Sequence, residues 1–189
     1  MKELNRRLLE EAKVDENNRL RVDMFLNHQL DVEFIDKIGK EFHKRFKDEN
    51  ITKILTVEAS GIAIAYATAR YFHVPMIFAR KSTHRSPRSD VYTTKVYSFT
   101  KTKSFHISIV KDYMNPDDRI LIIDDFLGNG EAVLGLYSMI LEAQADLVGV
   151  GMVIEKGFMS GGEIIRRRGI RLESLATIQS IDHDHVVLE

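Results

Sequence analysis

Two stretches of the chain each have the pattern of strand, helix and strand, and they constrain the fold more than any other feature. In residues 53–81, "KILTVEASGIAIAYATARYFHVPMIFARK", an apolar strand is followed by a small-residue turn, a helix and, after Pro75, a second strand. Residues 119–157, "RILIIDDFLGNGEAVLGLYSMILEAQADLVGVGMVIEKG", repeat this order. Continuous apolar runs are typical of strands covered by helices on both faces of a parallel sheet. We therefore predict an α/β fold with a doubly wound, mostly parallel sheet.

The remainder of the chain fits around this sheet. With 189 residues, the chain is long enough for one sizeable core and too short for two ordinary domains. An amphipathic helix is predicted at residues 1–13. Alternating apolar residues over 19–29, "RLRVDMFLNHQ", predict a short strand or extended arm, and apolar residues at i, i+4 spacing predict a helix over 31–47. We predict a single domain over residues 1–189.

Composition excludes several classes of function. The net charge of -1 gives no basic field for nucleic acid, and the absence of Cys excludes disulfides and thiolate metal sites. The first residues have no apolar core typical of a signal peptide, and no apolar run approaches the length of a membrane span. We expect a cytoplasmic protein with neither nucleic acid nor membrane as a partner.

The segment "RILIIDDFLGNG" ends a buried strand on two adjacent carboxylates, Asp124 and Asp125. In the following "FLGNGEA", Gly128 and Gly130 open a helix, where free backbone N–H groups bind anions. The pattern predicts a phosphate cradle behind an acid pair that could accept hydrogen bonds from two ribose hydroxyls or orient a hydrated divalent cation. The alternative is an ordinary strand–helix turn with a capped start.

Three other segments fall beside this predicted cleft. "VEASGI" repeats the strand–turn–helix pattern with Glu58 and Gly61, which favours a second anion cradle or a plain tight turn. Residues 80–103 hold seven Lys and Arg residues against one Asp, which indicates a mobile basic lid over a polyanion or a solvated surface hairpin. Lys156 follows the next strand and points either into the cleft or to water. Ligands bind beyond the carboxyl ends of such strands.

These residues resemble the signature that binds phosphoribosyl pyrophosphate (PRPP) in type I phosphoribosyltransferases. The resemblance extends in order across nearly the whole chain: "VDMFLNHQLD" (22–31), "ITKILTVEASGIA" (51–63), "FARK" (78–81), "VYSFTK" (96–101), "VIEKGF" (153–158) and "RLESLATIQSI" (171–181). The resemblance is strongest to the bacterial members of the family that act on xanthine. It implies transfer of phosphoribose from PRPP to N9 of xanthine, giving XMP and pyrophosphate, with Mg²⁺ held mainly by PRPP and no metal ligated by the protein alone.

The resemblance also implies roles for individual residues. The catalytic pair expected to bind the ribose hydroxyls is Asp124 and Asp125. The residues expected to hold the 5'-phosphate are Gly128, Asn129, Gly130, Glu131 and Ala132. The residues expected to meet the pyrophosphate are Glu58, Ser60, Gly61, Arg80 and Lys81. The residues expected to contact xanthine are Leu20, Asn27 and Lys156. The family fold adds a hood from about residues 1–35 and 157–189, a flexible basic loop over about 82–103, and a homodimer.

Two of the base-site residues have defined chemistry. The ammonium group of Lys156 can donate to the 6-oxo group, which adenine lacks. The amide of Asn27 offers both a donor and an acceptor to the group at C2, which distinguishes xanthine from guanine and hypoxanthine. An alternative is that Asn27 caps the helix beginning near Asp31, although Asp31 is better placed as the cap.

Two departures from the family pattern and three rival functions stay open. Asn129 and Glu131 stand where most relatives have threonines, although backbone N–H groups can still bind the anion. Ala59 replaces an expected serine. The same chemistry on guanine or hypoxanthine is one rival. A non-catalytic PRPP-sensing regulator is a second, but the chain lacks a DNA-binding appendage. A phosphoryl receiver is a third, and it would not need two glycine cradles.

Overall fold

The fold is built on an eight-stranded, mostly parallel sheet. The computed structural model describes residues 1–84, 86, 88–98, 103–182 and 185–189. Along the sheet the strands run β10 (His185–Leu188), β9 (Leu172–Asp182), β8 (Asp146–Lys156), β7 (Arg119–Leu127), β3 (Lys53–Val57), β4 (Met76–Ser82), β6 (Lys103–Val110) and β5 (Val91–Ser98). The five strands from β9 to β4 are parallel, and the pairs at both edges are antiparallel. The predicted fold class is confirmed.

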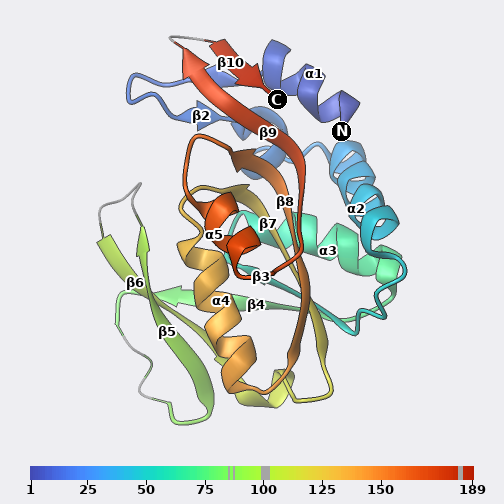
Figure 1. Ribbon diagram of the computed structural model, residues 1–189, viewed down its shortest axis with the longest axis vertical. Coiled ribbons are helices and arrows are strands. Elements are labelled where there is room, and N and C mark those ends of the chain that lie inside the picture. The colour runs from blue at the N-terminus through green and yellow to red at the C-terminus, as the bar shows by residue number, and fades with distance from the viewer. Residues whose placement is uncertain (85, 87, 99–102, 183–184) are drawn as a thin grey trace.

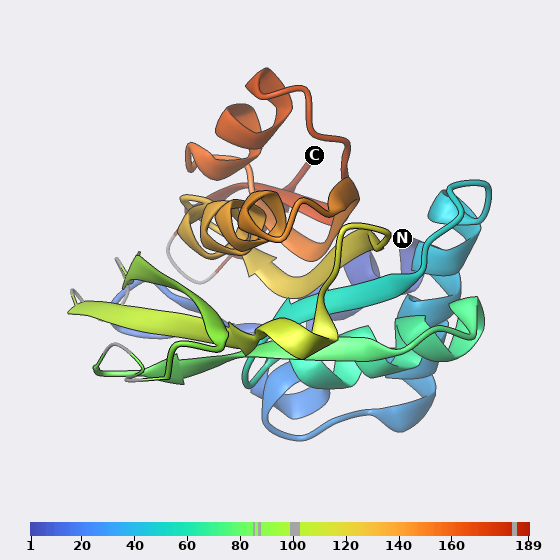
Figure 2. The same ribbon diagram turned by 90° about the horizontal axis from the view of Figure 1, so that it is seen from below.

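Helices cover both faces of the sheet (Figure 2). On one face lie α2 (Val32–Phe46) and α3 (Gly61–Phe72); on the other lie α4 (Glu131–Glu142) and α5 (Gly161–Arg167). The predicted apolar stripe of α2 is confirmed, because four side chains at i, i+4 spacing are fully or almost fully buried: Phe34, Ile38, Phe42 and Phe46. The two cores on either side of the sheet hold the central strands rigidly, so that their carboxyl ends form a fixed platform.

The two ends of the chain gather at one end of the molecule (Figure 1). There α1 (Lys2–Glu10) lies beside β9 and β10, and the short strands β1 (Lys13–Val14) and β2 (Leu20–Arg21) pair with each other. Two ion pairs anchor this region to α2: Arg7 on α1 binds the carboxylate of Asp31 (Nη1–Oδ2 2.7 Å), and Lys37 binds Glu3. The two chain ends therefore pack together and against α2 at one end of the molecule. The hood over the base site stays a prediction.

The predicted extended arm over residues 19–29 is wrong beyond Arg21. After β2 the chain forms a single π-helical turn, η1 (Asp23–Asn27). The backbone N–H groups of Phe25 and Leu26 both donate to the carbonyl oxygen of Val22, and all three side chains are fully buried. A strand would place Phe25 and Leu26 on opposite faces, whereas the turn buries both in the same core.

The segment predicted as a basic loop contains regular structure. β5 and β6 form an antiparallel hairpin that projects from the sheet (Figure 1), and β5 takes residues 91–98 out of the predicted loop. Val96 and Ile107 are buried under α4, because the cross-strand pairs alternate between an apolar and a polar face. Residues 85, 87 and 99–102 of this segment lie outside the described residues. A short 3₁₀ turn, η2 (Lys111–Tyr113), leads from the hairpin toward β7.

Candidate active site

The two carboxylates at the end of β7 are buried. Asp124 is 6% exposed and Asp125 is 8% exposed, and the backbone N–H of Asp125 donates to Oδ1 of Asp124 (3.0 Å). Burial raises the pKa of Asp124 well above its usual range, and the adjacent charge of Asp125 raises it further. Asp124 therefore takes up a proton far more readily than an exposed aspartate does. The site thus has one carboxyl group biased toward its neutral form directly beside a second carboxylate.

The junction between β3 and α3 is closed around Asp124. A Cβ atom added to Gly61 would lie 2.1 Å from Oγ1 of Thr56 and 2.3 Å from Oδ1 of Asp124. Only glycine fits there. On the same junction, Oε1 of Glu58 accepts a hydrogen bond from the backbone N–H of Lys81 (2.6 Å). This junction holds the first carboxylate in place and joins β3 to the end of β4.

The junction between β7 and α4 is open by comparison. Gly130 precedes α4 with φ +84°, a left-handed conformation that favours glycine. No side chain caps this end of the helix, so the N–H groups of its first turn have no side-chain acceptor. Uncapped N–H groups at the positive end of a helix dipole are donors for an anion. The arrangement suits an anion such as the predicted phosphate, and we call residues 128–132 the phosphate loop after that predicted role.

The phosphate loop lines a cavity of about 510 Å³. Other walls come from the end of β4, the β5–β6 hairpin, the ends of β7 and β8, and the segment before α5. The lining residues outside the loop are Lys81, Ser82, Thr83, Val96, Tyr97, Lys103, Ser104, Phe105, Phe126, Leu127, Val133, Lys156 and Met159. Backbone N–H groups that can donate to an anion, three lysines, and apolar or aromatic side chains therefore line the same cavity. This lining suits a phosphorylated ligand that carries a flat apolar group.

Two side chains connect this cavity to the carboxylates and to the chain ends. Nζ of Lys156 lies 5.5 Å from the centre of the Phe126 ring. Burial lowers the pKa of Lys156, the positive charge of Arg19 lowers it further, and Asp125 opposes the shift. From η1, Nδ2 of Asn27 reaches Oδ2 of Asp125 at 3.5 Å. The lysine thus enters the cleft, and the asparagine lies over the acid pair.

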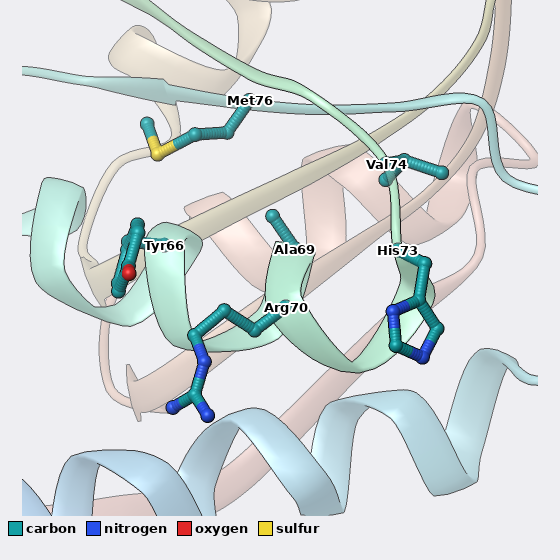
Figure 3. Close-up of a pocket in the computed structure, with 6 residues that line it drawn as sticks. All are labelled: Tyr66, Ala69, Arg70, His73, Val74 and Met76. Atoms are coloured by element: carbon teal, nitrogen blue, oxygen red, sulfur yellow. The ribbon is translucent and has the colours of Figure 1, made fainter.

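A second hollow of about 480 Å³ lies along the C-terminal half of α3 (Figure 3). Tyr66, Val74 and Met76 border it, while the Arg70 side chain extends toward α2 and binds Asp36 (3.0 Å). It contains none of the predicted site residues. Within the described part of the chain, no group of three or more His, Cys, Asp or Glu side chains is placed to hold a metal ion, and no helix is long and apolar enough to cross a membrane.

Residues 21–160 match the profile of the phosphoribosyl transferase domain. The chain belongs to the phosphoribosyltransferase family. Two relatives cover nearly its whole length: a xanthine phosphoribosyltransferase of Clostridioides difficile (51% identical, covering 98% of each chain) and one of Clostridium novyi (47% identical, covering 100% of each). Among solved structures, adenine phosphoribosyltransferase of Saccharomyces cerevisiae covers 93% of this chain and 99% of its own, with a TM-score of 0.71 at 17% identity. That structural similarity shows the type I phosphoribosyltransferase fold.

The fold of this chain places most of the predicted site residues in or beside the cavity. The whole phosphate loop, Lys81 and Lys156 line the cavity. Asp124 and Asp125 directly precede Phe126 in its wall, and Glu58 accepts a hydrogen bond from the backbone of Lys81.

Eight of the predicted residues do not themselves line the cavity: Glu58, Ser60, Gly61, Arg80, Asp124, Asp125, Leu20 and Asn27. Leu20 is buried in the core beneath the chain ends, Asn27 lies over the acid pair, and the Arg80 guanidinium stacks near Phe78 (5.8 Å from Cζ to the ring centre). The helix-cap alternative for Asn27 is wrong, because Oδ1 of Asp31 accepts the capping hydrogen bond from the N–H of Phe34 (3.1 Å).

Sequence reasoning missed several wall residues, among them Phe126, Phe105 and Met159. Phe126 directly follows the acid pair, so its position at a strand end could have indicated it. Phe105 lies on β6, and its role depends on a hairpin that a basic, weakly periodic segment conceals. Met159 is brought to the phosphate loop only by the packing of α5, for which the local sequence carries no signal.

Proposed function

We propose that the protein transfers the 5-phosphoribosyl group of PRPP to N9 of xanthine, giving XMP and pyrophosphate, as a purine salvage enzyme. The observation that carries the proposal is that the phosphate loop and Lys156 line the same cavity of about 510 Å³, directly beyond the acid pair of β7. One cavity can then hold a 5'-phosphate, a ribose and a purine in order. The relatives near 50% identity that are named for xanthine support the choice of base.

The phosphate loop is assigned to the 5'-phosphate. Its donors are backbone N–H groups at the start of α4, so the side chains of Asn129 and Glu131 need not contact the anion. Lys81 and Lys103 face the loop from the other walls of the cavity. We assign these two lysines to the diphosphate end of PRPP, because their positive charges attract it. The turn from Glu58 to Gly61 and the Arg80 guanidinium are assigned to the same end.

The acid pair is assigned to the two ribose hydroxyls. In the reaction, the bond from C1 of the ribose to pyrophosphate breaks, and its electron pair leaves on the pyrophosphate oxygen. N9 of the base forms the new bond to C1, and the proton of the base passes to the departing pyrophosphate or to solvent. Positive charge develops on the ribose ring between these events. The carboxyl group of Asp125 stabilises that charge, and Asp124 fixes the hydroxyls. Positioning and electrostatics supply the catalysis without a nucleophile from the protein.

A divalent cation fits this inventory as a partner of the substrate. Carboxylate oxygens are ligands that Mg²⁺ accepts, and Asp124 and Asp125 are the two buried carboxylates at the ribose position. With two carboxylates rather than a full cage, the cation would be held mainly by PRPP oxygens. When bound, Mg²⁺ supplies positive charge that makes pyrophosphate a better leaving group.

Base choice is assigned to Lys156 and Asn27. The lowered pKa of Lys156 and its position beside Phe126 suit donation to the 6-oxo group of a purine that lies on the aromatic ring. Adenine has no 6-oxo group. Asn27 can donate to the 2-oxo group of xanthine and accept from N3–H. With guanine, the 2-amino group and the amide N–H would face each other as two donors, and no hydrogen bond would form between them. Guanine and hypoxanthine also carry the 6-oxo group, so Asn27 is the residue that has to distinguish them from xanthine.

The proposal extends to the setting of the enzyme. The family resemblance favours a homodimer in the cytoplasm, with PRPP and xanthine as the only substrates and with neither nucleic acid nor membrane as a partner. Size-exclusion chromatography coupled to light scattering tests the dimer, since a dimer has twice the 21.7 kDa mass of the chain.

One experiment tests the proposed reaction. The protein is incubated with Mg²⁺, PRPP and, separately, xanthine, guanine, hypoxanthine or adenine, and the nucleotide formed is identified by chromatography and mass spectrometry. We expect XMP at the highest efficiency and no AMP. Formation of AMP, or a preference for guanine over xanthine, would contradict the assignments of Lys156 and Asn27. No nucleotide with any base would contradict enzymatic function.

A further inference from the structure

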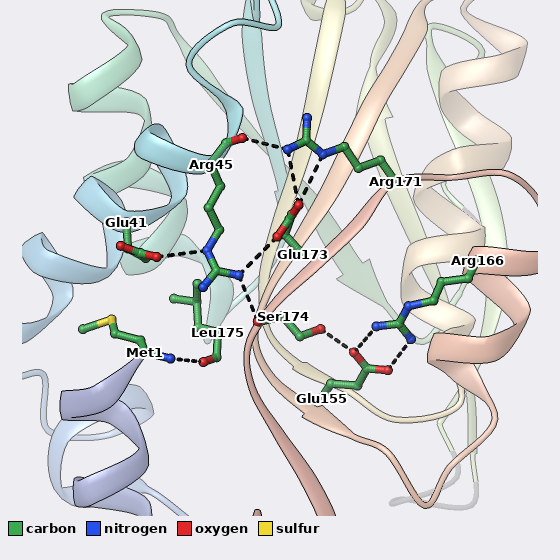
Figure 4. Close-up of polar contacts among 9 residues, drawn as sticks. All are labelled: Met1, Glu41, Arg45, Glu155, Arg166, Arg171, Glu173, Ser174 and Leu175. Atoms are coloured by element: carbon green, nitrogen blue, oxygen red, sulfur yellow. Dashed lines mark hydrogen bonds and ion pairs between the residues drawn. The ribbon is translucent and has the colours of Figure 1, made fainter. Parts of the chain in front are cut away.

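A buried carboxylate lies immediately before Lys156 on β8. Glu155 is 4% exposed, and its two oxygens accept a pair of hydrogen bonds from the guanidinium of Arg166 on α5 (Nη1–Oε1 2.6 Å and Nη2–Oε2 2.8 Å; Figure 4). The hydroxyl of Ser174 on β9 donates to the same carboxylate. Three elements that follow one another along the chain are therefore joined at one point.

The charge of Glu155 is retained despite its burial. Burial raises the pKa of Glu155, but the hydrogen bonds from Arg166 and Ser174 outweigh this effect and leave the pKa below its usual value. A two-pronged contact between guanidinium and carboxylate fixes distance and orientation together. The backbone also accommodates the pair, because a Cβ atom on Gly162 would lie 1.9 Å from Oε1 of Glu155. The pair is therefore a defined joint rather than a loose surface contact.

The joint connects two parts of the cavity. Along β8, neighbouring side chains point in opposite directions, so fixing Glu155 on one side also fixes where Lys156 emerges on the other. At the other end of the joint, α5 begins against the phosphate loop: the N–H of Gly161 donates to the carbonyl oxygen of Gly128 (3.0 Å). Met159, just before α5, lines the cavity. Arg166 thus ties the backing of the phosphate loop to the strand that carries Lys156.

We propose that Glu155 and Arg166 are positioning residues, which set the distance between the phosphate loop and the Lys156 ammonium and thereby fit the cavity to a nucleotide. Neither side chain needs to touch the substrate. This inference rests on the proposed function, in which the loop holds the 5'-phosphate and Lys156 meets the base. Misplacing such groups by a fraction of an ångström weakens the reaction because both ends of one ligand have to be met at once.

The chain offers a matched control on the same helix. Arg167 neighbours Arg166 and pairs with Glu163 of α5, but the side chains of this pair are 78% and 61% exposed. An exposed pair of this kind contributes little and joins α5 only to itself. Replacing Arg167 therefore removes an equal charge from the same helix without touching the joint.

The test compares the wild type with three variants: the double variant Glu155→Gln with Arg166→Gln, the single variant Arg166→Lys, and the control Arg167→Gln. The double variant removes both charges, so it leaves no buried charge without a partner. For each protein we measure KM for PRPP, KM for xanthine, kcat and the melting temperature. We expect KM for both substrates to rise on the order of tenfold or more in the double variant. Arg166→Lys should recover part of the loss, because it keeps the charge but not the two-pronged contact.

Hydrogen exchange of the amides at residues 128–130 and 156, without ligand, gives a readout independent of turnover. We expect faster exchange there in the double variant and no change in Arg167→Gln. Unchanged KM values and unchanged exchange in the double variant would overturn the proposal, as would equal effects of the double variant and the control. If the wild type formed no XMP, the proposed function would fail, and the exchange comparison would still decide whether the joint positions the loop.

Discussion

The chain contains two strand–helix junctions of the same type, and they do different things. At the β3–α3 junction, Gly61 is packed against Asp124 and Thr56, and the space that a side chain would need is already filled. At the β7–α4 junction, Gly130 instead adopts a left-handed conformation at the edge of a cavity. The first turns of both helices lack a side-chain cap, so the difference lies in what packs against each glycine. One glycine is required by what packs on it, and the other by the shape of the backbone.

The closed junction combines support with binding, whereas the open junction serves binding alone. The closed junction packs against Asp124 and, through Glu58, accepts a hydrogen bond from the end of β4. The open junction presents backbone donors to the cavity. A ligand with phosphates at both ends can use both: the open junction for the 5'-phosphate, and the turn of the closed junction for the pyrophosphate, while the same junction fixes the first carboxylate between them. Substitutions at each junction separate the two roles.

The largest effect is expected where the two junctions meet, at the acid pair. Changing Asp124→Asn together with Asp125→Asn should lower kcat by about a hundredfold or more, because the positive charge on the ribose loses its stabilising carboxylate. The fold should survive, since a buried strand end loses two adjacent like charges. Steady-state kinetics and circular dichroism measure the two properties. Near-normal turnover in the folded double variant would remove the ribose assignment.

An added methyl group should affect the two junctions differently. Gly61→Ala would force the Asp124 carboxylate to move, so we expect the free energy of unfolding to fall by about 1–3 kcal/mol. Gly128→Ala would meet nothing closer than Sδ of Met159 at 3.4 Å, an ordinary contact. Its stability should stay within about 0.5 kcal/mol of wild type, while KM for PRPP rises because the new methyl group lines the cavity. Denaturant unfolding and kinetics decide; equal destabilisation would contradict the distinction.

The smallest expected effect is the pH dependence of stability that Asp124 causes at the closed junction. Because the pKa of Asp124 is raised in the folded protein, stability from its neutral carboxyl group is full below the usual pKa of 3.8 and is lost as the pH rises through the folded pKa. Asp124→Asn keeps an acceptor for the N–H of Asp125 and cannot ionise. We expect it to melt about 3 °C or more above wild type at pH 8, with the gain shrinking toward pH 4. A constant difference at all pH values would contradict the buried ionisation.

Much of this architecture follows from local sequence. The apolar runs of β3 and β7 predicted a parallel sheet, and the stripe from Phe34 to Phe46 predicted α2, because both patterns reflect burial of a single segment. The turn at η1 was not predictable in this way. Its apolar residues fit an alternating strand as well as a turn, and only the shared burial of Phe25 and Leu26 decides between them.

In the site, too, residues that are adjacent in sequence were predictable and contacts between distant residues were not. Adjacent residues such as Asp124 and Asp125 indicate a site because their charges are costly to bury. Contacts between distant residues leave no such trace: Gly61 and Asp124 are 63 positions apart, and nothing in either local sequence indicates that they touch. The same holds for Glu155 and Arg166, whose spacing of 11 residues is meaningful only after α5 has folded back onto β8 and β9.

Hydrogen exchange with two partial ligands tests directly whether each junction binds one phosphate end of PRPP. XMP carries the 5'-phosphate without a diphosphate, and pyrophosphate with Mg²⁺ is the diphosphate alone. The amides of residues 128–132 should be protected by XMP and little affected by pyrophosphate. Those of residues 58–61 and 80–81 should be protected by pyrophosphate with Mg²⁺ and little affected by XMP. Protection of both junctions by the same ligand, or of the 58–61 junction by XMP alone, would contradict the assignment of one junction to each phosphate end.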